Sequence, residues 1–580
     1  MPRPSPSPHE MGVRPQWKLR LILAAAITGT VLVMIRPTIP SMRSTLPTNL
    51  GDTSLNAWIL AWQSHALTTH PSQWFGGNVY FPYGNSLGYS ELMLPLLAVF
   101  GPVFLATGNA VLAYNVTQIA LLCLCLWATF RLARYLGCSP ISAYCAALAF
   151  SFNAYFFAHS VHLQLLTMGF FPLGFLCLLR LFDRRRKRDG VALGLVTAAL
   201  VTGCLYYGVM WLLIVAVLVG VDAWRSVRRD LSVASIRPHL VAAGVAGVLL
   251  APIGLLYVHF QSSSGFHRPL PSGEGLRPSD FLSPSVGSRV YGAAGRAAGA
   301  TFAGTGHMFF MGATVFILAA IGLVQVARLS THEDQVAGGK PAAPLAHWRG
   351  LLLAGAMSFV LAIGPSVGSI PAPFRFFYEF VPGFDSVRAV ARLAVPGLLV
   401  VAMLGAVGLD RLRARLKFSP LAVGVGACVL VAFELSVSVP RVDATRNEAA
   451  NALHVALKAR PSGPVIELPI AGSNDGLFAL MVEERRMLHS IGDWRQRVNG
   501  VSGGNPIDYN AKADLFALFP DAKSVNQLRA WGVKFVMLHT SSDGETLTYS
   551  VAQAQKIVAA LPVGTSVEWL SGGAIITFDR

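Results

Sequence analysis

The chain has 580 residues, of which 53% are hydrophobic and only 13% are charged, and its net charge is +17. Soluble globular proteins carry roughly 25% charged residues, so the composition excludes an ordinary soluble protein and predicts a polytopic membrane protein. The positive charge fits the excess of Lys and Arg that membrane proteins keep on the cytoplasmic side; it does not indicate nucleic-acid binding, because no basic patch is interleaved with aromatic residues.

The first 18 residues are rich in Pro, Ser and Arg, a composition typical of disordered segments. We expect residues 1–18 to form a disordered cytoplasmic tail. The apolar run that follows has no A-x-A-like cleavage site near its end. It is therefore interpreted as a retained signal anchor rather than a removed signal peptide.

Residues 19–439 contain eleven stretches of the length and apolarity that a membrane-spanning helix needs, about 20 residues. Clusters of Arg and Lys follow the even-numbered stretches, so one topology, with the N-terminus in the cytoplasm and the C-terminus outside, puts all of them on the cytoplasmic side. The fifth and sixth are short and are expected to form a tight hairpin around Tyr206 and Tyr207. The predicted spans are 19–38, 109–132, 140–159, 163–182, 190–207, 209–225, 237–258, 307–328, 350–368, 391–409 and 419–438.

Residues 40–108 form the first predicted external loop. Trp58, Trp62 and His65 recur at i, i+4 and i+7 and so share one face of a helix, which we expect to lie at the membrane surface, where Trp is enriched. The apolar segment 92–107 is broken by Pro and Gly. It is interpreted as interfacial or re-entrant, because a full span there would reverse every later charge cluster.

Asp52 is the main candidate functional residue of this loop, because ionisable groups near a bilayer are costly and tend to be kept for function. Its carboxylate could act as a general base on an acceptor hydroxyl or help to hold a divalent cation. A structural role explains the residue equally well, since Asp is a favoured N-cap and Asp52 precedes the helical LNAWILAW run. Glu91 is the other carboxylate of the loop.

Two further external loops, residues 259–306 and 369–390, lead to the remaining charged candidates. Arg388 and Arg392 are spaced i, i+4 at the mouth of the tenth span, and two guanidinium groups on one helical face could grip a phosphate. Interfacial snorkelling is the alternative, but the positive-inside bias favours a function for arginines on the external side. The second loop adds four weaker candidates: Arg268, Arg277, Arg289 and Arg296.

His159 and His162 lie at the end of the third span, in the sequence HSVHLQ. We expect a helix-end or substrate-contacting role for this pair rather than a metal site, because no carboxylate is near in sequence. The chain contains no Walker loop and no HExxH zinc motif. The missing Walker loop argues against ATP-driven transport.

Residues 440–580 differ in charge from the rest of the chain, because they contain 14 basic and 14 acidic residues and are neutral overall. Helices are predicted over 447–460, 475–490 and 550–561, and strands over 464–470 and 533–539, followed by a final pair of strands in TSVEWL and GAIITFD. This order predicts a small α/β domain on the external face.

Several segments resemble the GT-C superfamily of integral-membrane glycosyltransferases, in particular a bacterial YfhO-like group. The resemblance covers most of the chain. Its motifs are Gly51-Asp52 followed by LNAWILAW, FPYGNSLGYSELMLPL at 81–96, HLQLLTMGFFPL at 162–173, Tyr206-Tyr207, PGFDSVRAVARL at 382–393, HSIGDWRQRVNGVSGGNP at 489–506 and LRAWGVKFVMLH at 528–539.

The resemblance implies a GT-C-like domain of about eleven transmembrane helices over 19–439 and an extracytoplasmic α/β domain over 440–580. It further implies an inverting hexosyl- or pentosyltransferase that moves a sugar from a polyprenyl-phosphate donor to a glycan, lipid or protein acceptor. The base would be the acidic residue of the first external loop, Asp52, and Arg388 and Arg392 would stabilise the leaving phosphate. Because Asp52 has no acidic neighbour, we expect no required cofactor, with a divalent cation as the alternative.

Ten residues are expected to contact substrate: Trp58, His65, Glu91, His162, Gln164, Tyr206, Tyr207, Trp494, Arg495 and Asn499. The loop 489–506 would fold back over the site, or else serve as a plain connection within the α/β domain. The expected location is the bacterial plasma (inner) membrane, in contact with membrane lipids and not with nucleic acid.

Two other functions compete with the transferase. A transporter or flippase of lipid-linked saccharides would need charged groups near mid-membrane, and Glu434 is the main one in the predicted spans. A non-catalytic envelope scaffold would instead use the external domain to bind a partner.

Overall fold

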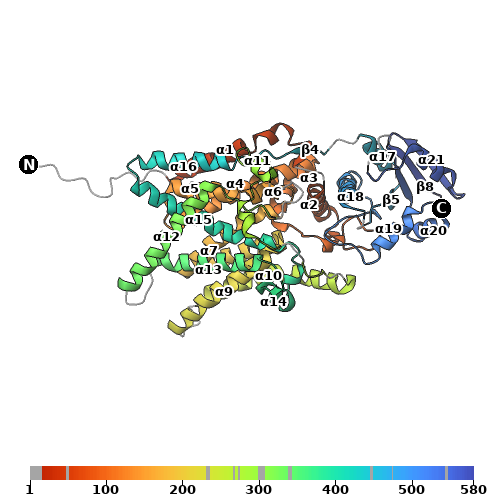
Figure 1. Cartoon of the computed structure of the whole chain (residues 1–580). Helices are drawn as coiled ribbons and strands as arrows, with labels where there is room; N and C mark the ends of the chain where they lie inside the picture. Colours follow the sequence, from red (N-terminus) through yellow and green to blue (C-terminus); the bar gives the residue numbers. More distant parts are fainter. Residues whose placement is uncertain are drawn as a thin grey trace, which may run out of the picture.

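The computed structural model describes residues 16–47, 51–229, 236–265, 268–271, 275–297, 307–336, 343–444, 448–472, 475–541 and 546–579. The expected tail lies largely outside these residues. A bundle of apolar helices makes up most of the chain, and a smaller α/β region lies at one end of it (Figure 1).

Seven helical segments of the described chain are long and apolar enough to cross a membrane, and four shorter apolar helices accompany them. Ten of the eleven predicted spans coincide with one of these helices, and the remaining one, 190–207, coincides with α8, which is helical but is not among them. Three of the shorter helices match predicted spans, and the fourth, Leu94–Thr107, matches the segment interpreted as interfacial. The bundle helices are α1 (Gln16–Met34), α3 (Leu97–Thr107), α4 (Ala110–Tyr135), α5 (Pro140–Ser151), α6 (Ala154–Ala158), α7 (Phe170–Arg184), α8 (Lys187–Gly203), α9 (Leu205–Arg229), α10 (Arg237–Ser264), α12 (Ala313–Val336), α13 (Ala343–Ala362), α15 (Val395–Arg415) and α16 (Pro420–Glu434).

Helix α15 lies in the core of the bundle and contacts α5, α12, α13 and α16. Its approach to α12 depends on glycine. A Cβ atom on Gly408 would lie 1.8 Å from the Leu318 carbonyl oxygen, and one on Gly322 would lie 1.9 Å from that of Leu404. Small residues allow this close backbone contact, which is how membrane helices gain packing energy without a hydrophobic driving force.

The loops between the bundle helices contain α2 (Asp52–Thr69), α11 (Gly292–Ala297), α14 (Pro373–Phe380) and the two-residue strands β2 (Ser366–Val367) and β3 (Ile370–Pro371). Helix α2 was expected to lie at the membrane surface. It is instead buried along most of its length, because α3 and α4 of the bundle and α18 (Leu477–His489) all pack against it.

The C-terminal region is built on a four-stranded sheet of order β5-β6-β8-β7, in which β5 and β6 are parallel and the other pairs antiparallel. The predicted helices and strands are present. The sequence did not predict two short helices that cover the sheet, α19 and α20. The elements are β5 (Val465–Leu468), β6 (Phe535–His539), β7 (Thr565–Leu570), β8 (Gly573–Phe578), α17 (Glu448–Lys458), α18, α19 (Tyr509–Ala517), α20 (Ala522–Ala530) and α21 (Val551–Ala559).

A short antiparallel pair ties the two ends of the bundle sequence together. β1 (Thr45–Pro47) follows α1, β4 (Arg441–Asp443) follows α16, and the two strands pair with each other. Arg441 fixes the pair: its guanidinium donates to Thr45 Oγ1 at 2.8 Å and to Asn115 Oδ1 on α4 at 2.9 Å. The ends of the first and last bundle helices therefore lie on the same side, next to α2 and the C-terminal region.

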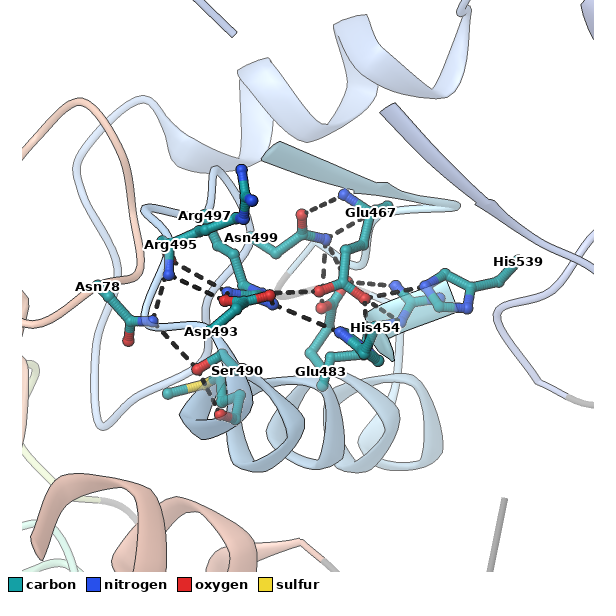
Figure 2. A network of polar contacts seen from close by, with 12 residues as sticks. Asn78, His454, Glu467, Glu483, Ser490, Asp493, Arg495, Arg497, Asn499 and His539 are labelled. Atoms are coloured by element: carbon teal, nitrogen blue, oxygen red, sulfur yellow. Dashed lines mark hydrogen bonds and ion pairs between the residues drawn. The ribbon is translucent and has the colours of Figure 1, made fainter. Parts of the chain in front are cut away.

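The C-terminal region is joined to the first loop through main-chain hydrogen bonds. Arg497 N donates to Asn78 O at 2.8 Å, Phe81 N donates to Arg497 O at 2.8 Å, and Tyr80 N donates to Asn499 O at 3.1 Å. The Asn78 side chain also donates to the Arg495 carbonyl, as Figure 2 shows. This seam holds α18 against α2.

Candidate active site at the junction of the bundle and the C-terminal region

Asp52 lies at the beginning of α2, directly after the N-cap residue Gly51. The N-cap position is therefore occupied by a glycine and not by Asp52. The Asp52 carboxylate points instead to His162, whose Nε2 lies 3.2 Å from Asp52 Oδ2. The Asp52 side chain is 49% exposed and that of His162 is 15% exposed. The carboxylate is thus open to a substrate on one side and held by an imidazole on the other.

Two arginines act on this carboxylate from the segment before α15. Burial alone would raise the pKa of Asp52, but the charge and hydrogen bond of His162, together with the charges of Arg392 and Arg388, lower it below its ordinary value. Asp52 is therefore ionised at neutral pH, the form that a general base requires. The guanidinium of Arg392 lies over the ring of Tyr206, 5.0 Å from its centroid.

The expected common helical face of Arg388 and Arg392 is not present. Arg392 lies in the 3-10 helix η10 (Val390–Ala394), and Arg388 precedes it. Pro396, near the start of α15, explains the difference, because its ring would clash with the carbonyl of Arg392 inside a continuous α-helix. Both arginines nevertheless lie close enough to influence Asp52.

Several buried polar atoms around Asp52 have no hydrogen-bond partner among the described residues: Nε of Arg392, Nε2 of His159, Nδ1 of His162 and Oε1 of Gln164. His159 Nδ1 donates to the Tyr155 carbonyl at 2.9 Å, so its Nε2 is free to accept a hydrogen bond. Buried polar groups are normally paired. A group of them beside an ionised carboxylate indicates a site for a polar ligand.

Glu91 of the first loop supports this site together with Tyr206 and Tyr207, which lie at the beginning of α9. Glu91 accepts a hydrogen bond from the Leu205 amide at 2.6 Å, one residue before Tyr206. Burial raises the pKa of Glu91, although the Leu205 amide and Arg392 act against that shift. Tyr207 is fully buried and donates to the Leu165 carbonyl at 2.8 Å. Tyr206 is thus the tyrosine next to the arginines, whereas Tyr207 holds the segment that carries the histidines.

Two further residues lie near the site: Glu484, which the sequence did not single out, and Arg268, which it marked only as a weaker candidate. Glu484 of α18 is buried, and burial, followed by the negative charge of Asp52, raises its pKa well above the ordinary value. Arg268 of the second loop lies near Tyr206, Arg388 and Glu91, whose charges act on it. No motif marks Glu484, because its position depends on the packing of α18 on α2.

Three of the residues expected to contact substrate lie on α2 or against it, away from Asp52: Trp58, His65 and Trp494. Trp58 is buried, and its Nε1 donates to Asn78 Oδ1 at 2.9 Å. His65 lies about two turns further along the helix and stacks on Trp494, with ring centroids 4.2 Å apart. The loop 489–506 thus does fold onto the first loop, but Trp494 meets the far end of α2.

Arg495 and Asn499 belong to a buried polar network of the C-terminal region (Figure 2). The Asn499 side chain donates to the Glu467 carbonyl at 2.8 Å and to Glu483 Oε1 at 3.0 Å. Arg495 donates to the carbonyls of Leu457 and Pro461. The structure gives both side chains protein partners rather than placing them beside Asp52.

The comparisons with known proteins locate the fold. No protein-family model and no curated protein sequence matches the chain significantly. The structure is similar to arabinofuranosyltransferase AftD from Mycobacteria, with a TM-score of 0.56 and 14% identity over 97% of this chain and 40% of AftD. This chain therefore spans about two-fifths of the length of AftD.

Two other solved structures are similar at lower TM-scores. An oligosaccharyltransferase from Archaeoglobus fulgidus has a TM-score of 0.48 and 13% identity over 91% of this chain and 70% of its own. ArnT from Cupriavidus metallidurans has a TM-score of 0.47 and 12% identity over 97% and 98%. The fold assignment rests on AftD: this multi-pass membrane chain has the fold of the GT-C glycosyltransferases.

Proposed function

We propose that the chain is an inverting glycosyltransferase that moves a sugar from a polyprenyl-phosphate donor to an envelope glycan, lipid or protein acceptor. The observation that carries the proposal is the meeting of Asp52, His162, Arg388 and Arg392 at one end of a GT-C-like bundle. These groups are far apart in sequence, and together they supply an ionised carboxylate next to fixed positive charge.

Each group has a role in the proposed reaction. Asp52 takes the proton of the acceptor hydroxyl as its oxygen attacks the anomeric carbon. The bond from that carbon to the lipid phosphate breaks on the opposite face, which inverts the configuration. Arg392 and Arg388 stabilise the negative charge that grows on the phosphate. His162 orients the base through its 3.2 Å contact with Asp52.

The proposed location is the bacterial inner membrane, with the N-terminus in the cytoplasm and the C-terminal region outside. The basic clusters after the even-numbered spans support this orientation. The pairing of β1 with β4 also supports it, because this pairing puts Asp52 and the C-terminal region on one side of the bundle.

The sharpest test of the proposal asks which class of sugar donor the protein uses. Purified full-length protein is incubated with acceptor-bearing envelope membranes and a panel of radiolabelled sugars, each supplied as a polyprenyl phosphate and as a nucleotide sugar, with and without EDTA. Transfer from a lipid-linked sugar alone supports the proposal. Transfer from nucleotide sugars, or equal transfer by Asp52→Asn, contradicts it. The EDTA arm measures metal dependence directly.

A further inference from the structure

A cavity lies between the bundle and the C-terminal region, and Asp52 does not line it. Its volume is about 890 Å³. Arg43 after α1, the turn between α3 and α4, Lys458 at the end of α17 and the segment 488–495 form its walls. Neither Asp52, His162 nor the two arginines of the candidate active site line it. The cavity therefore needs an explanation of its own.

The free charges at this cavity are positive. Arg43 and Lys458 are exposed, and neither side chain has a hydrogen bond or ion pair within the described part of the chain. Asp493 is the only carboxylate in the lining, and both of its oxygens bind Arg497, at 2.9 and 3.0 Å. The two free cations are far apart in the sequence and line one cavity.

The part of the wall formed by Trp494 is held in place by aromatic contacts. Trp494 is half-buried, stacks on His65 and meets Trp62 edge to face at 5.9 Å. Its φ of 55° lies in the left-handed region, which a tryptophan adopts only when its surroundings impose it. The tertiary contacts thus hold the ring in place at the cavity.

The remaining wall is the beginning of a membrane-spanning helix. Ala110 and Val111 are the first residues of α4, and Asn109 caps it by accepting the Leu112 amide at 2.7 Å. The amides of a first helical turn have no partner within the helix and carry partial positive charge. Since α4 crosses the membrane, the cavity lies at the membrane surface.

We propose that this cavity binds the phosphate group of a ligand at the membrane surface. Arg43 and Lys458 would donate to the phosphate oxygens from two sides, with the polar groups of Thr107 and Asn109 and the ring of Trp494 lining the remainder of the ligand. The same chemistry is offered by a phospholipid headgroup and by a free phosphate ester. The proposal does not depend on sugar transfer, because binding is expected without donor or acceptor.

The test measures binding to purified full-length protein by native mass spectrometry. The probes are phosphatidylglycerol and the soluble ester glycerol 3-phosphate. The test variant is Arg43→Ser/Lys458→Ser. The control Lys523→Ser/Lys556→Ser removes the same charge from exposed lysines that do not line the cavity.

We expect the test variant to bind at least about tenfold more weakly than wild type, because charge-assisted hydrogen bonds are the strong ones, and we expect the control to bind normally. If the test variant loses binding of phosphatidylglycerol alone, the cavity is a lipid site. If it loses binding of both probes, the cavity is a site for the phosphate ester itself. Equal binding by all proteins, or no binding of either probe to wild type, overturns the proposal.

A measurement on wild type alone guards against a folding defect in the variant. Amide hydrogen exchange over residues 107–112 and 488–495 is compared with and without each probe. Slower exchange in both segments is expected for the probe that binds. Unchanged exchange with both probes overturns the proposal independently of any substitution.

Discussion

His162 Nε2 lies 3.2 Å from Asp52 Oδ2, across 110 residues of sequence. The contact joins the first turn of α2 to the segment between α6 and α7. It gives the carboxylate a fixed direction while leaving about half of its side chain exposed to a substrate. A base oriented in this way depends on the bundle and the first loop being assembled together.

Replacing His162 by Asn is expected to move the acid limb of kcat/KM to higher pH. His162 is the main partner that lowers the pKa of Asp52. Without it the pKa rises, so the base becomes protonated, and activity falls, at a higher pH than in wild type. Measuring kcat/KM against pH for both proteins checks this. An acid limb at the same pH would show that His162 does not tune Asp52.

Replacing Arg392 by Gln is expected to reduce transfer by about two orders of magnitude, the usual effect of removing one preorganised donor to a developing charge. Loss of turnover at saturating donor would show that the arginine acts on the leaving phosphate. The control is Arg375→Gln, which removes an exposed arginine paired with Glu379 on α14. A similar loss in the control would point to a general charge effect.

Replacing Glu484 by Gln is expected to leave activity within about threefold of wild type. Burial and the neighbouring charge of Asp52 raise the pKa of Glu484 well above its ordinary value, which favours its neutral form, and a glutamine imitates that form. Glu484→Lys places a buried positive charge there and should unfold the junction. If Glu484→Gln were as inactive as an Asp52 variant, Glu484 would take part in the reaction as a carboxylate.

The C-terminal region is expected to lose stability as the pH falls from about 6.5 to about 4. Burial lowers the pKa of His454 from 6.5 to about 4 and that of His489 to about 3. Between these values and 6.5 the two histidines bind protons in the unfolded chain but not in the folded chain, so their contribution to stability rises with pH across this window, whereas the raised pKa of Glu484 acts in the opposite direction. Below about 4 the loss due to His454 is complete.

Thermal unfolding followed by tryptophan fluorescence at several pH values measures this effect. The control is His454→Gln, which lacks one of the titrating groups and should therefore lose less stability across the same window. The same pH dependence of the melting temperature in wild type and in His454→Gln would contradict the account of the buried histidines.

The helices and strands were largely predictable, because hydropathy and alternation act over short distances. The positions of spans such as α4, α7 and α10, and of β5 and β6, follow from their apolar patterns. The burial of α2 was not predictable. Its face with Trp58 and Trp62 has the pattern of a membrane-surface helix, and only its packing against α3, α4 and α18 makes it a buried element.

Part of the candidate site was predictable from the sequence, and part depended on contacts between distant segments. Asp52, His162 and Arg392 stood out as charged or ionisable groups at the ends of spans, and the fold brings them together. Glu484 has no such mark. Trp494 and Arg495 stood out in a Gly-rich loop, but their partners lie at the far end of α2 and around α17.

The most direct test of the central claim is the rate of sugar transfer by Asp52→Asn relative to wild type, with the donor that the panel identifies. Asparagine keeps the shape of the side chain and its contact distance to His162, but it cannot take a proton. The account predicts a fall of about 100-fold or more at an unchanged melting temperature, with full activity in the exposed control Glu568→Gln, whose side chain is 55% exposed. Transfer by Asp52→Asn at the wild-type rate would contradict the account.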